Sequence, residues 1–65
     1  MSELQSAILT RIARGETDAE IGKALALSRS RLRVETSRIF LMIGTPNRNA
    51  AAAWWGRYTV RERLP

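Results

Sequence analysis

The densest group of chemically capable side chains in this sequence is a set of four arginines within ten positions: Arg29, Arg31, Arg33 and Arg38. A guanidinium group is a planar fork of N–H donors that suits phosphate oxygens and the O6 and N7 acceptors of guanine. Residues three or four apart share one face of a helix, so Arg29, Arg33 and Ser37 would form one patch on a helix. The spacing therefore predicts a helix that recognises a polyanion.

The sequence contains few residues that could support other kinds of chemistry. The chain contains no cysteine and no histidine, which removes disulfides, zinc fingers and the usual nucleophile–base pairs. Its six Asp and Glu residues are scattered along the sequence. We therefore expect neither an enzyme, nor a metal site, nor a cofactor.

The charge is unevenly distributed. The formal net charge is +5 and the pI is about 11.4. Residues 1–22 hold two arginines and four acids, whereas residues 23–65 hold nine basic residues and two acids. A basic carboxyl-terminal part favours double-stranded DNA as the partner.

The length and hydropathy of the chain limit the number of domains and the kinds of segment that it can contain. A chain of 65 residues makes one small domain, and such domains bury only about 60% of their unfolded surface and are marginal alone, so a partner subunit is expected. No apolar run approaches 18 residues, and the amino terminus lacks the basic and apolar regions of a signal peptide. We expect a cytoplasmic protein without a membrane segment.

Apolar spacing and capping residues predict the first two helices. The first spans about residues 3–14, with a capping box at Ser2 and Gln5 and a stop at Gly15. The second starts with a capping box over residues 17–20 and ends near residue 26. Its predicted buried stripe is Ile21, Ala24 and Leu25.

Two further helices follow. Ser28 is the expected N-cap of a helix over about residues 29–43, which Gly44 ends. Its predicted core face is Leu32, Thr36, Ile39, Phe40 and Ile43. The last helix would start at Thr45-Pro46 or Asn47 and weaken at Gly56. These elements predict an all-α domain over residues 1–57 and a basic tail over residues 58–65, which is a strand, a helix extension or a frayed arm.

Three segments together resemble one DNA-binding family. They are TDAEIG at 17–22, LSRSRLR at 27–33 and MIGTPNR at 42–48. Their order and spacing are similar to the LuxR/GerE/FixJ type of domain, across about residues 2–55. The resemblance implies a four-helix LuxR/GerE-like helix-turn-helix fold with its third helix in the DNA major groove. Members of that family usually carry a sensor or receiver domain ahead of this module, and because nothing precedes it here we expect a stand-alone domain.

The resemblance assigns roles position by position. The residues that face base edges are Arg33, Val34 and Ser37. The residues that hold phosphates are Thr17, Arg29, Ser30, Arg31, Arg38 and Arg48. The fourth helix supplies the dimer surface, through Ala50, Ala51, Ala53 and Trp54.

The expected function is a sequence-specific transcription regulator that binds a pseudo-palindromic site as a homodimer. Two alternatives stay open. One is an interaction protein, or antiactivator, that pairs with a full-length relative or another regulator through the fourth helix. The other is a module that binds RNA polymerase, similar to the domain of sigma factors that recognises the −35 promoter element.

Several residues depart from the family pattern. Ala26 stands where a turn glycine is usual, so the turn is expected to be reshaped, and Gly22 is attributed to closer helix crossing. Glu35 either pairs with Arg31 or Arg38, or accepts a hydrogen bond from cytosine N4. An exposed Leu41 suggests a dimer or partner surface.

The aromatic residues Trp54, Trp55 and Tyr58 are interpreted as core and interface anchors, and the alternative is base stacking. Arg57, Arg61 and Arg63 are a solvated tail or a second phosphate contact.

Overall fold

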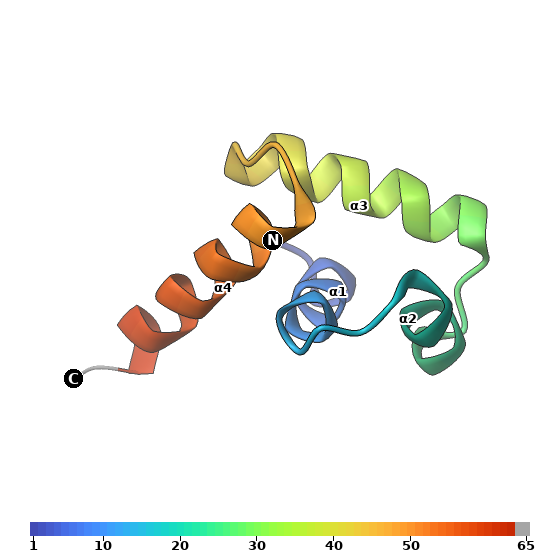
Figure 1. The fold of residues 1–65 in the computed structure, drawn as a ribbon, viewed down its shortest axis with the longest axis horizontal. Coiled ribbons are helices and arrows are strands. Elements are labelled where there is room, and N and C mark those ends of the chain that lie inside the picture. The colour runs from blue at the N-terminus through green and yellow to red at the C-terminus, as the bar shows by residue number, and fades with distance from the viewer. Residues whose placement is uncertain (64–65) are drawn as a thin grey trace.

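Four helices make up the part of the chain that is described. The computed structural model describes the backbone of residues 1–63 and the side chains of residues 1–60. The helices are α1 (Glu3–Ala13), α2 (Asp18–Leu25), α3 (Arg29–Ile43) and α4 (Arg48–Arg63), and these residues contain no strand. The fold is all-α, as the sequence predicted. Figure 1 shows α3 lying across one side of the molecule, with α1, α2 and most of α4 on the other.

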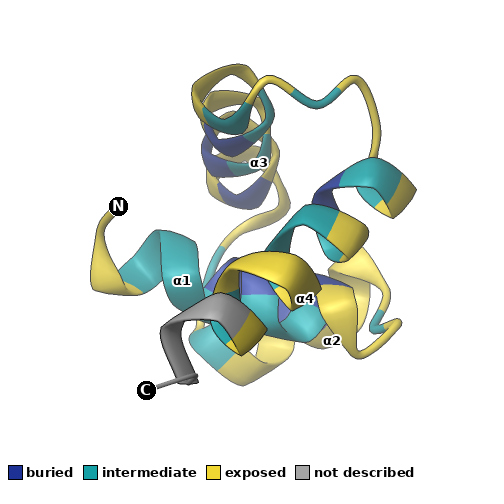
Figure 2. Ribbon diagram, turned by 90° about the vertical axis from the view of Figure 1, so that its left-hand side faces the viewer, coloured by how far each residue is buried: buried dark blue, intermediate teal, exposed yellow. Residues whose placement is uncertain are grey.

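All four helices contribute to one core (Figure 2). The buried residues are Ile8, Leu9 and Ile12 of α1, Ile21 of α2, Leu32 and Ile39 of α3, and Ala51 of α4. Half-buried Leu25, Phe40 and Ile43 pack against this cluster. The predicted core faces are therefore correct except at Ala24, which is exposed. None of the helices described has the combination of length and hydropathy needed to cross a membrane.

Local capping explains where the helices begin. Ser2 and Thr17 each form the predicted capping box, with Gln5 and Glu20 as the partners three residues on. Ser28 caps α3 through a 3.1 Å bond from the Arg31 N–H. Asn47 Oδ1 accepts a 2.8 Å bond from the Ala50 N–H, so α4 starts from Asn47.

The capping box of α2 predicts a pH effect. Hydrogen bonds from the Thr17 backbone and side chain lower the pKa of Glu20 from its usual 4.5. A carboxyl group whose pKa is lower in the folded state stabilises the protein above its unfolded pKa, and this contribution is lost as pH falls. We expect Glu20→Gln to lose less stability than the wild type between pH 6 and pH 3 in urea titrations. Parallel pH curves for the two proteins would contradict this account.

The connection between α2 and α3 contains the most unusual backbone conformation of the described chain. Ala26 has φ 54° and ψ 44°, so it takes the left-handed conformation expected of glycine and the turn is not reshaped. The turn closes through a 2.8 Å bond from the Leu27 N–H to the Gly22 carbonyl. A Cβ at Gly22 would lie 3.0 Å from the Leu27 carbonyl oxygen. Gly22 therefore makes room for the turn, and the attribution to closer helix crossing is wrong.

Replacing Ala26 with glycine should stabilise the protein. Left-handed alanine costs about 1–2 kcal/mol, and the extra freedom of an unfolded glycine offsets about 0.4–1 kcal/mol of the gain. We expect a net gain of about 0.5–1 kcal/mol, seen as a higher Tm in thermal unfolding. Ala24→Gly, at a helical position of the same helix, should instead lose about 0.5–1 kcal/mol. A lower Tm for Ala26→Gly would show that this alanine is not strained.

The carboxyl-terminal segment takes one of its three expected forms, a helix extension, over residues 58–63. Helix α4 runs through Gly56 to Arg63, so residues 58–63 extend the helix and do not form a separate tail. The Thr59 hydroxyl donates a 2.9 Å bond to the Trp55 carbonyl across this stretch. Residues 64–65 lie outside the described residues, as do the side chains of Arg61 and Arg63. The helix was expected to weaken at Gly56, but this glycine does not end it: Gly56 lies inside α4, and a Cβ added there would meet no atom within 4 Å.

Candidate nucleic-acid interface

The amino-terminal half of α3 is exposed and basic. The residues that the sequence placed on its recognition face are all exposed: Arg29, Ser30, Arg31, Arg33, Val34, Ser37 and Arg38. They belong to one continuous helix, and the core lies on its opposite side (Figure 2). The structure therefore brings together seven of the nine residues proposed to contact DNA.

The only acidic residue of α3 points away from this surface. Glu35 is 5% exposed, and its Oε1 accepts a 3.3 Å bond from Arg38 Nη1. The pairing expected for Glu35 is therefore confirmed with Arg38, and a carboxylate this deeply buried is not available to a cytosine amino group. Glu35 shares a face with Leu32 and Ile39, at a spacing of three and four residues. That spacing was the signal for its burial.

Thr17 lies at the start of α2. It is exposed, and its hydroxyl oxygen accepts a 3.2 Å bond from the Glu20 N–H. Helix α2 is anchored through buried Ile21, so the position of Thr17 relative to α3 is fixed by the core.

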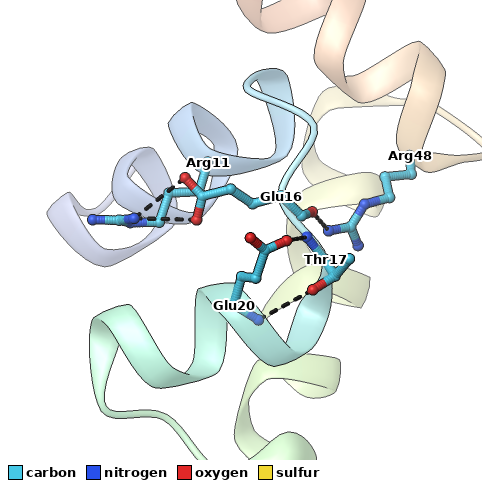
Figure 3. A network of polar contacts seen from close by, with 5 residues as sticks. All are labelled: Arg11, Glu16, Thr17, Glu20 and Arg48. Carbon is cyan, nitrogen blue, oxygen red and sulfur yellow. Dashed lines mark hydrogen bonds and ion pairs between the residues drawn. The ribbon is translucent and has the colours of Figure 1, made fainter.

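Arg48 differs from the other proposed phosphate contacts because its guanidinium group binds within the protein (Figure 3). Its Nη1 donates to Asp18 Oδ1 at 2.5 Å. Its Nη2 donates to the Glu16 carbonyl at 2.6 Å, the bond that Figure 3 draws. The side chain of Glu16 accepts from Arg11 Nη1 at 3.1 and 3.3 Å. The network joins α4 to α1 and to the first turn of α2. A phosphate would have to replace two charge-assisted hydrogen bonds to engage Arg48.

The residues expected at the dimer surface differ in how far they are buried. Ala51 is fully buried in the core of its own chain, so its assignment to a dimer surface is wrong. Trp54 is half-buried and packs against that core, and Ala50 is also half-buried. Ala53 is exposed. Helix α4 packs against α1 of the same chain through this alanine face. The sequence pattern does not distinguish such packing from packing against a second chain.

The aromatic residues of α4 form one stacked group. The Trp54 and Tyr58 ring centroids are 5.1 Å apart with 10° between their planes, and Trp55 and Tyr58 are 5.5 Å apart. Both tryptophans pack against the core. This arrangement supports the interpretation of the two tryptophans as core anchors, whereas Tyr58 is 40% exposed and stacks on them.

Comparison with protein-family models, with curated proteins and with solved structures finds no match to this chain.

Proposed function

We propose that this protein is a sequence-specific DNA-binding transcription regulator that inserts helix α3 into the major groove. The observation that carries the proposal is the exposed basic face of α3. Four arginines lie on it, and the single acid of the helix is buried. A surface of this charge attracts the phosphate backbone without an acidic group to repel it.

The local geometry suits a groove. Helix α3 has 15 residues and is therefore about 22 Å long, and the major groove, about 12 Å wide, admits an α-helix. Helix α2 precedes it across residues 26–28, in the order of a helix-turn-helix of the LuxR/GerE type. The amino-terminal end of α3 adds a positive dipole and free N–H groups.

In this proposal the side chains divide into two roles. Arg33, Val34 and Ser37 contact base edges. Phosphates are held by Thr17, Arg29, Ser30, Arg31 and Arg38, and Arg48 instead fixes α4 to α2. Two copies, paired through the exposed side of α4 around Ala53, place their α3 helices in successive major grooves of a pseudo-palindromic site.

The salt dependence of binding tests this proposal. A duplex recovered from a random pool by the purified protein is used in band shifts between 50 and 200 mM salt. A dimer that neutralises about six phosphates through Arg29, Arg31 and Arg38 of each subunit should give a slope of about −5 in a plot of log affinity against log salt concentration. The absence of a shift with any DNA at micromolar protein would overturn the proposal and favour an interaction protein that pairs through α4.

A matched pair of variants locates the contact. Arg29→Ala removes one phosphate contact from each subunit, so the slope should flatten by about 2. Arg14→Ala removes the same charge from the exposed end of α1, outside the proposed interface, and should leave the slope unchanged. Equal flattening in both variants would indicate attraction by net charge without a defined surface.

A further inference from the structure

Helix α3 has an uncharged strip along the side that faces away from the core. The strip consists of Ser30, Val34, Ser37 and Leu41, at the spacing i, i+4, i+7 and i+11 that keeps residues on one helix face. All four residues are exposed, Val34 by 46% and Leu41 by 84%. No helix lies over this side of α3 in Figure 1. The outward strip therefore extends well beyond the half of α3 that the sequence assigned to recognition.

Arginines border this strip on both sides. Arg29 and Arg33 precede strip residues by one position and lie along one border, whereas Arg31 and Arg38 follow strip residues and lie along the other. Their exposed side chains make two positive margins around an uncharged centre, and Arg33 is the one proposed to reach from its margin to a base edge. Two copies meeting strip to strip would bring these margins together, which like-charge repulsion opposes.

The major groove has the complementary arrangement. Its walls are phosphates, and its floor presents base edges, where the apolar group is the C5 methyl of thymine. Val34 and Leu41 have no hydrogen-bonding side-chain atoms, so methyl groups are the partners available to them on the floor. Seven residues of helix separate them by about 10.5 Å, which is close to three base-pair steps of 3.4 Å.

From this geometry we infer that Leu41 is a second apolar base-contacting residue, which together with Val34 selects thymines about three base pairs apart by their methyl groups. The inference rests on the proposed function and adds the class of base feature that α3 recognises. It also places α3 along the groove floor as far as Leu41.

Uracil substitution tests this inference. The wild-type protein selects a duplex from a random pool, and each thymine of that duplex is replaced in turn by deoxyuridine, which lacks only the methyl group. We expect an affinity loss of about fourfold for each contacted methyl, at two positions about three base pairs apart in each half-site. In Leu41→Ala the loss at one of these two positions should disappear, and in Val34→Ala the loss at the other.

Met42→Ala is the matched control, because Met42 is 50% exposed beside Leu41 but lies off the outward strip. It should retain both uracil effects.

A selected duplex without thymines at this spacing, or a Leu41→Ala variant with both uracil effects unchanged, would overturn the inference while DNA binding itself stands. If light scattering showed that Leu41→Ala is monomeric, and its uracil profile were unchanged, Leu41 would instead be assigned to a subunit contact. Selection of no duplex at all would refute the proposed function.

Discussion

Replacing Arg33 with alanine is expected to weaken binding to the selected duplex by about 1–3 kcal/mol, or roughly 5- to 150-fold. Arg33 is exposed on the half of α3 that is proposed to face the groove, where its guanidinium group can donate to guanine O6 and N7 together. The variant should also lose its preference at one base pair in each half-site. A second selection from the random pool with Arg33→Ala measures both effects.

Arg29→Ala is the comparison for this prediction. It removes the same group one helical turn earlier, at a position proposed to contact phosphate, so it should weaken binding to all sequences alike. Its selected duplexes should match those of the wild type. If Arg33→Ala kept both the affinity and the base preference of the wild type, α3 would lie in the groove in a different register.

Replacing Arg48 with alanine should have its main effect on folding. The substitution removes two charge-assisted hydrogen bonds and leaves the Glu16 carbonyl and Asp18 without this partner. Hydrogen bonds to charged groups contribute about 1.5–3 kcal/mol, and partial exposure of Arg48 reduces this. We expect a loss of about 1–2 kcal/mol in urea unfolding, and a Tm lower by roughly 5–15 °C.

Arg48→Lys separates charge from geometry at this position. Lysine keeps the positive charge, but its compact ammonium group does not reproduce the fork that spans Asp18 and the Glu16 carbonyl. We expect Arg48→Lys to lose most of the same stability, and neither variant to change the salt slope of DNA binding where the protein is folded. A flatter slope in Arg48→Ala, with stability unchanged, would return Arg48 to the phosphate contacts.

Local signals in the sequence predicted the helices well. Capping residues such as Ser2 and Thr17 act within four positions, and the structure confirms both boxes. Gly15 and Gly44 have φ 83° and 71° and end their helices as expected. Each of these features depends on the backbone nearby, so its energy is set by a few adjacent residues and is visible in the sequence.

The misassigned residues depend on contacts between distant segments. Whether Ala51 packs on its own chain or on another is decided by α1, which lies nearly forty residues earlier. The bond between Arg48 and Asp18 joins residues 30 positions apart, and a count of charges does not reveal it. Gly22 was misjudged for a different reason, because the atom that excludes a side chain there is the backbone oxygen of Leu27 in the adjoining turn.

The stacked aromatic group also determines what can be observed in solution. Both tryptophans and the single tyrosine of the chain lie on α4, whereas α3 carries only a phenylalanine. Tryptophan fluorescence therefore reports on whether α4 is packed against α1, without interference from the helix proposed to bind DNA. Intrinsic fluorescence can follow detachment or pairing of α4 during a DNA titration, with no label attached to the protein.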